Sequence, residues 1–80
     1  MSIRQSLFAY LDTLASRDIS GWQLFTEIQA RTGRNSYPAT LLGYAREYSA
    51  ISGGRFDCVD PDRSIYRFEP GAKIAGAIVD

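Results

Sequence analysis

The stretch that decides the fold is residues 19–68, which contains ISGWQLF at 19–25, TGRNSYP at 32–38, SGGRF at 52–56, DPD at 60–62 and IYRF at 65–68. Two helical patterns, separated by a short polar turn, precede two short runs in which apolar and polar residues alternate. Alternation of this kind is typical of strands, and the Asp-Pro-Asp run between them is typical of a turn. The stretch therefore predicts two helices followed by a β-hairpin.

The first of these two helices carries signals at both ends. Ser20 and Gln23 have the spacing of a capping box, in which the serine side chain accepts from a backbone N–H at the start of the helix. Ile19, before the cap, can pack on Leu24 as a hydrophobic staple. Gly33 stands where a left-handed residue commonly ends a helix. These signals predict a helix from about residue 20 to residue 32.

Two more helices are predicted on either side of this one. Residues 3–16 have apolar side chains at helical spacing, and Ser2 and Gln5 repeat the capping-box pattern. The last helix is predicted to start at Pro38, because proline lacks an N–H and fits the first helical position. We expect that helix to continue to about Ser49.

The hairpin is predicted to have strands at residues 55–59 and 65–68. A five-residue loop between them pairs Phe56 with Phe68 and turns Cys58 inward, where its thiol would be unreactive. Ile19 adds a strand of one or two residues beside the hairpin. The predicted core takes the inner side of every element: Leu7, Leu11, Leu14, Trp22, Phe25, Ile28, Leu41, Ala45, Tyr48, Phe56, Tyr66 and Phe68.

Length and composition limit the architecture to one domain. The chain has 80 residues, and we assign residues 1–69 to the domain and residues 70–80 to a tail. The tail either packs on the first helix through Ile74, Ile78 and Val79 or is loose. The overall class is mainly α with a small antiparallel hairpin, that is, α+β.

Several functions are disfavoured by the composition. With no histidine and one cysteine, the chain lacks the commonest metal ligand and the commonest general acid–base group. We therefore expect no enzymatic activity, cofactor, metal or small-molecule substrate. We also expect no disulfide, signal peptide or membrane span, which together favour a cytoplasmic protein.

In its element order the chain resembles the winged helix-turn-helix superfamily. The resemblance covers about residues 7–68 and rests on the capped SGW at 20–22, the YPATLL at 37–42 and the Gly-Gly hairpin. It implies a three-helix winged helix that binds double-stranded DNA, with the helix from Pro38 in the major groove and the hairpin as the wing. Such a protein would be a transcriptional regulator or another DNA-docking protein.

The resemblance also implies a set of DNA-contacting residues. Thr40 and Arg46 are the candidates for reading bases, and the candidates for phosphate contacts are Arg31, Arg34, Ser36, Tyr37 and Arg55. The chain has eight arginines and one lysine, and arginine suits phosphate and guanine. A genome rich in GC would produce the same bias, and the arginines would equally suit a solvated rim with local ion pairs.

A second interpretation is a protein-interaction or dimerisation module without DNA binding. The net charge is zero, and the hairpin tip carries Asp57, Asp60 and Asp62, which phosphates would repel. On the helix from Pro38, the small residues Ala39 and Gly43, with Glu47 next to them, would let a partner helix or a second copy approach closely. The arginines favour DNA, and the net charge favours this alternative.

Overall fold

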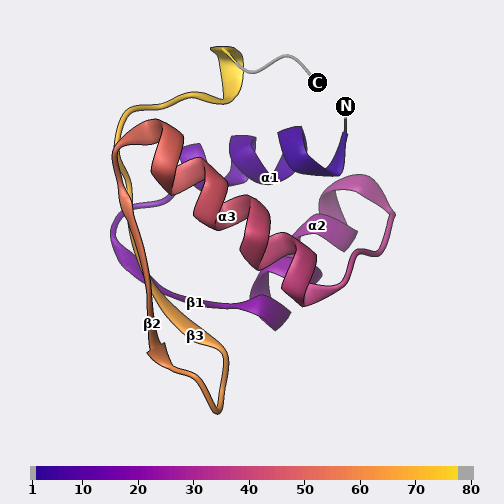
Figure 1. Cartoon of the computed structure of the whole chain (residues 1–80). Coiled ribbons are helices and arrows are strands. Elements are labelled where there is room, and N and C mark those ends of the chain that lie inside the picture. The colour runs from indigo at the N-terminus through magenta and orange to yellow at the C-terminus, as the bar shows by residue number, and fades with distance from the viewer. Residues whose placement is uncertain (1, 78–80) are drawn as a thin grey trace.

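Residues 2–77 are described by a computed structural model, in which three helices pack against a three-stranded antiparallel sheet (Figure 1). In chain order the elements are α1 (Ile3–Asp12), β1 (Arg17–Ser20), α2 (Gly21–Thr32), α3 (Pro38–Ser52), β2 (Arg55–Asp60), β3 (Ile65–Glu69) and the 3₁₀ helix η1 (Ala75–Ala77). The chain is therefore α+β, as the sequence predicted. Within the described residues, no helix combines the length and the apolar character needed to cross a bilayer.

The sheet has three strands where the sequence predicted a hairpin with a short stub. β3 lies in the middle and pairs with β1 on one side and β2 on the other. β1 contributes four paired residues, and Ile19 lies opposite Tyr66. The stub is longer than predicted because the turn after α1 ends early enough for Arg17 to pair with Phe68.

The hairpin register was predicted correctly, with Phe56 opposite Phe68 and Cys58 opposite Tyr66. The loop differs by one residue. Val59 is an extra residue in β2, a β-bulge, so that Asp60 still pairs with Ile65. Asp60 thus belongs to the strand instead of the predicted five-residue loop.

The helix ends follow the capping signals. The side chains of Ser2 and Ser20 each accept a backbone N–H three residues later, and Gly33 ends α2 with a φ of 69°. α1 is shorter than predicted, because Thr13 caps it and the chain must turn before β1. α3 is three residues longer and ends at Gly53, whose φ is 81°.

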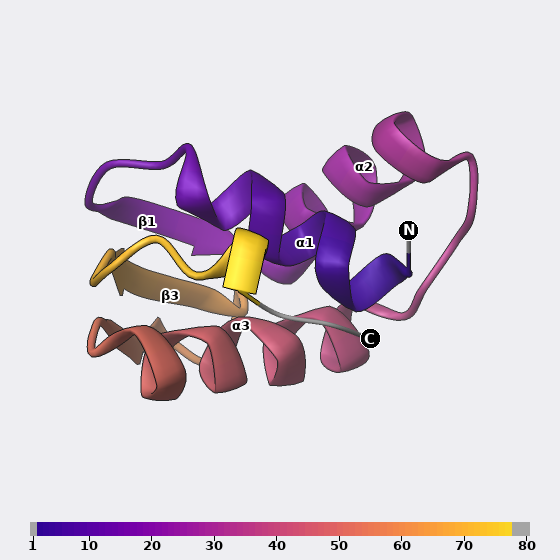
Figure 2. The same cartoon turned by 90° about the horizontal axis from the view of Figure 1, so that it is seen from above.

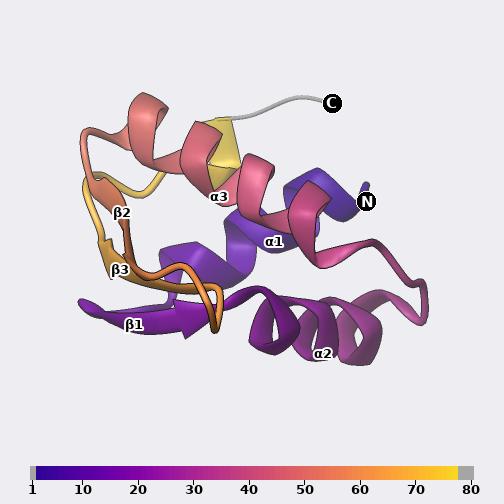
Figure 3. The same cartoon turned by 60° about the horizontal axis from the view of Figure 1, so that its bottom comes forward.

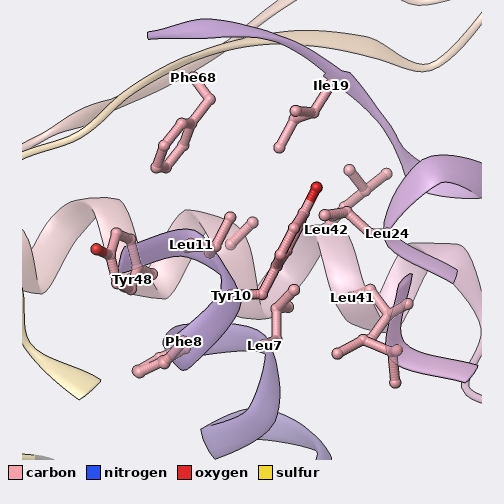
Figure 4. Close-up of a cluster of buried hydrophobic side chains, with 12 residues drawn as sticks. Leu7, Phe8, Tyr10, Leu11, Ile19, Leu24, Leu41, Leu42, Tyr48 and Phe68 are labelled. Carbon is pink, nitrogen blue, oxygen red and sulfur yellow. The ribbon is translucent and has the colours of Figure 1, made fainter. Parts of the chain in front are cut away.

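The core lies between α1, α2, α3 and the sheet, and Figure 4 shows its largest side chains. Tyr48 packs edge-on against Phe8, with ring centroids 5.3 Å apart, and lies 6.0 Å from the Phe68 ring. Seven predicted core residues are buried: Leu7, Leu11, Ile28, Leu41, Ala45, Tyr48 and Phe68. Four are half-buried against the core: Leu14, Phe25, Phe56 and Tyr66.

Two predictions about the core were wrong. Trp22 is 66% exposed, because it lies two positions before the buried Leu24, about 200° around the helix. Cys58 is exposed as well. Its strand runs past the helices at the lower end of the hairpin in Figure 1, so that no helix covers that part of the sheet.

The segment after β3 returns to α1. Asp12, the last residue of α1, accepts the Tyr48 hydroxyl at 2.5 Å and the backbone N–H groups of Ile74 and Ala75 at 3.2 and 3.0 Å. Ile74 is half-buried against the core. The other two tail residues named in the sequence analysis, Ile78 and Val79, lie outside the described residues.

Gly21 and Gly43 make a matched pair for a test of helix packing. A Cβ on Gly21 would lie 2.9 Å from the Pro38 Cβ and 3.2 Å from the Leu42 Cδ1, whereas a Cβ on Gly43 meets nothing within 4 Å. We expect Gly21→Ala to lower the free energy of unfolding by about 1–3 kcal/mol through overpacking. Gly43→Ala should raise it by about 0.5–1 kcal/mol through helix propensity. Urea unfolding followed by circular dichroism measures both changes. Equal effects of the two substitutions would refute the close contact between the start of α2 and the start of α3.

The pH dependence of stability offers a second test, through Tyr48. Burial, reinforced by the bond to Asp12, raises the pKa of Tyr48 above its ordinary value of 10.0. The stability that the neutral hydroxyl contributes is therefore complete below about pH 10 and is lost as the pH rises further. Tyr48→Phe should flatten this alkaline decline in urea midpoints. Tyr44→Phe, the control, should retain the alkaline decline in stability. If Tyr48→Phe also retains it, the decline arises from other groups.

Candidate nucleic-acid interface

α3 has one bare side. α1 and α2 lie together on the other side of α3, and no described element covers its outer side (Figure 2). Leu41, Ala45 and Tyr48 project inward and are buried. The exposed residues of α3 are Ala39, Thr40, Gly43, Arg46, Glu47, Ala50 and Ile51. Both base-reading candidates, and all three residues of the alternative interface, therefore lie on the surface of the same helix.

The middle of this outer side is shallow because its residues are small. Nothing in the described part of the chain comes within 4 Å of where a Gly43 side chain would begin. The exposed glycine costs roughly 1 kcal/mol of helix stability relative to alanine, and no contact from the described residues at this position offsets that cost. The backbone of α3 is thus open to close approach at this point.

The acidic residue on this side, Glu47, is held by an arginine from another helix. The Nε and Nη2 atoms of Arg4, in α1, donate to the two carboxylate oxygens of Glu47 at 2.8 and 3.1 Å. The Arg4 guanidinium also lies 4.7 Å from the Phe8 ring centroid. This bidentate pair partly neutralises the negative charge on this side of α3, which would otherwise repel a phosphate. Arg4 had no predicted role, and 43 residues separate the two partners.

The five predicted phosphate contacts are spread over a wide surface. Arg34 is exposed in the turn before α3, and its backbone N–H donates to the Thr32 Oγ1. Arg55 is exposed at the start of β2, beyond the other end of α3. α3 has 15 residues and is therefore about 22 Å long, so it separates these two arginines. Arg46 lies between them along the helix.

The side chain of Arg31 is engaged by other parts of the molecule. Its Nε donates to Glu27, one turn earlier on α2, at 2.9 Å, and its guanidinium lies 5.1 Å from the Tyr10 ring centroid. Arg46 and Arg55, by contrast, form no ion pair with any other described residue. Among the candidate contacts, Arg46 and Arg55 are therefore available for an external anion.

The acidic hairpin tip is partly balanced by its own arginines. Asp60 accepts the backbone N–H groups of Asp62 and Arg63 at 3.2 and 3.3 Å, and its other carboxylate oxygen lies 3.8 Å from the Arg63 Nε. Asp57 lies opposite Arg67 on the neighbouring strand, and the ion pair of Arg67 is with Asp18 of β1, at 3.6 Å. Exposed pairs of this kind are weak, so they shape the turn more than they stabilise it.

Ser36 and Tyr37, both predicted to contact phosphates, line a hollow of about 280 Å³ together with Phe25 and Asn35. Tyr37 is 82% exposed, and no lining residue is charged. The sequence analysis missed this hollow because it assigned Phe25 and its neighbour Trp22 to the core. The sequence did contain one signal. The apolar residues of α2 cover more of the helix circumference than a single buried side, which indicates that some of them are exposed.

Comparison of the chain with protein-family models, curated protein sequences and solved structures gave no match. The element order α1-β1-α2-α3-β2-β3 and the sheet order β1-β3-β2 are compatible with a winged helix. Among the described residues, no three cysteine or carboxylate side chains gather as metal ligands.

Proposed function

We propose that this protein is a winged helix that docks on double-stranded DNA, with α3 as the recognition helix and the β2–β3 hairpin as the wing. It would act as a transcriptional regulator or in another DNA-docking role. The observation that carries the proposal is the bare outer side of α3, where Thr40 and Arg46 are exposed and Arg46 has no ion pair within the described chain. A helix of this diameter fits the major groove, which is about 12 Å wide.

Each residue has a distinct role in this proposal. Arg46 would donate two hydrogen bonds to a guanine, and Thr40 would contact a thymine methyl group or a phosphate. Arg34, Ser36 and Tyr37 at one end of α3, and Arg55 at the other, would contact the phosphates on the two sides of the groove. Arg31 would contribute less, because contact with DNA would first have to break its pair with Glu27.

The charge balance sets the expected strength of binding. Few cations face the DNA, and the net charge is zero, so few counterions would be released and affinity would be modest. Two base-reading residues also specify few base pairs. A pair of copies on adjacent half-sites, or a larger assembly, would supply the missing specificity.

Alanine variants separate base reading from phosphate binding. Fluorescence anisotropy of a labelled mixed-sequence duplex, over a salt series, should give an affinity that falls as salt is raised, with a slope that reflects the small number of phosphate contacts. Arg34→Ala should weaken binding to every sequence and reduce the salt slope by about 1. Arg46→Ala should instead remove about 1–3 kcal/mol of sequence preference.

The control for both variants is Arg17→Ala, an exposed arginine on β1, the edge strand that lies across the sheet from β2. It should leave binding unchanged. If Arg17→Ala weakens binding as much as Arg34→Ala does, the interface is misplaced. A flat signal at low salt would reject DNA binding by this chain.

Glu47→Gln tests the sign of the charge on the outer side of α3. The substitution removes a negative charge and weakens the hold on Arg4, so duplex affinity should rise by about fivefold at low salt, which is ~1 kcal/mol for one charge beside a phosphate in water. Asp18→Asn makes the same charge change on β1 and should alter the affinity little. An equal rise in both variants would indicate a general charge effect, without a contact at α3.

A second candidate function is a protein-docking module that uses the same side of α3. The open backbone at Gly43, with Ala39 one turn before it, favours this candidate because small residues let a partner helix come close. The zero net charge is consistent with it. The duplex experiment separates the two functions, since a module of this kind gives no salt-dependent signal with DNA.

A further inference from the structure

Three aromatic side chains, Trp22, Phe25 and Tyr37, form a surface that we name the aromatic patch. Trp22 and Phe25 lie in the first half of α2, and Tyr37 lies in the turn just before α3. Figure 3 shows this turn at the far end of both helices from the sheet. Trp22 is 66% exposed and Tyr37 is 82% exposed. The rings of Trp22 and Phe25 are 5.6 Å apart in an edge-to-face arrangement, and Phe25 and Tyr37 line the hollow of about 280 Å³.

The polar groups around the hollow are neutral. Asn35, Ser36 and Tyr37 supply the polar groups of its lining, and the Trp22 ring lies against Phe25, which also lines it. Neither these three polar side chains nor the Trp22 indole has a hydrogen-bond partner among the residues that the structure describes. The indole is a donor, and the amide and the hydroxyls can donate as well. A neutral, aromatic hollow rich in donors fits a neutral ligand rich in acceptors.

The size of the aromatic patch indicates what covers it. A tryptophan and a tyrosine bury 150–250 Å² each when fully covered, so their exposed parts present about 300 Å². A second copy pairing through this surface alone would fall well short of the ~800 Å² per partner that stable interfaces bury. An area of about 300 Å² is enough to hold a short peptide segment, and exposed patches of this size are often functional.

We propose that the hollow and the aromatic patch bind a short, extended, proline-containing segment of a partner protein. Such a segment adopts a polyproline II helix, whose backbone carbonyls have no internal partners and whose rings pack on aromatic side chains. The donors around the hollow match the carbonyls, and Trp22, Phe25 and Tyr37 match the rings. The lining carries no charge for a phosphate, which disfavours nucleic acid as the ligand here. This site is additional to DNA docking, although Ser36 and Tyr37 belong to both surfaces.

The chain contains one tryptophan, so its fluorescence reports directly on the aromatic patch. The experiment titrates the full chain with an oligoproline peptide and follows the emission of Trp22. We expect a saturable blue shift, because the exposed indole becomes covered. The shift should persist at high salt, since no ion pair is formed, and a Gly–Ser peptide of equal length should not produce it.

Two variants that each remove an exposed apolar side chain make the assignment specific. Tyr37→Ala should weaken oligoproline binding by about tenfold or more, the effect of removing an aromatic anchor. Ile51→Ala, which removes a half-exposed apolar side chain at the other end of α3, should leave the affinity unchanged. Circular dichroism checks that both variants fold, and both keep Trp22 as the reporter.

The proposal is overturned if oligoproline causes no shift, if the Gly–Ser peptide causes the same shift, or if Tyr37→Ala binds as tightly as the parent. A blue shift that appears on raising the concentration of the chain alone would identify a second copy as the occupant. One that appears with duplex DNA and disappears at high salt, while oligoproline gives none, would identify nucleic acid. Either of these results would also reject a proline-containing peptide as the occupant of the hollow. The anisotropy assay with DNA uses a different ligand and a different readout. Either proposal can therefore fail without deciding the other.

Discussion

Tyr48 is the side chain through which α3 is attached to the rest of the molecule. Its ring is buried between Phe8 of α1 and Phe68 of β3, and its hydroxyl donates to Asp12, which also holds the segment after β3. A helix held by one large aromatic residue has a defined rotation about its own axis. Arg46, two positions earlier, lies about 200° around the helix and therefore faces solvent. The orientation of the candidate interface thus depends on packing at the opposite side of the helix.

Local signals made the helix ends and the hairpin register predictable. The caps at Ser2 and Ser20 and the turn at Gly33 are short-range interactions, so the residues that form them are visible in a few letters of sequence. The boundaries that failed depend on distant partners. α1 stops early because β1 must reach β3, and Trp22 is exposed because Leu24 and Ile28 already fill the buried side of α2.

The candidate site was predictable to a smaller degree. The sequence placed Thr40 and Arg46 on the exposed side of the last helix through helical periodicity alone, and the structure has them there. It could not reveal the pair between Arg4 and Glu47, since no pattern links residues on separate helices. The sequence could not reveal the hollow at Tyr37 either. Its lining residues come from α2 and from the turn before α3, and sequence periodicity does not encode how far apart these two segments lie.

The extra residue at Val59 has a consequence for how copies of the chain behave toward one another. β2 is an edge strand, and an edge presents unpaired backbone groups that another strand can continue. With no net charge, the copies repel one another weakly, and Val59 adds an exposed apolar side chain at this edge. The bulge breaks the regular row of donors and acceptors and bends the strand at that position. An incoming strand can therefore match part of the edge but cannot extend along all of it, which protects a small neutral protein from edge-to-edge aggregation.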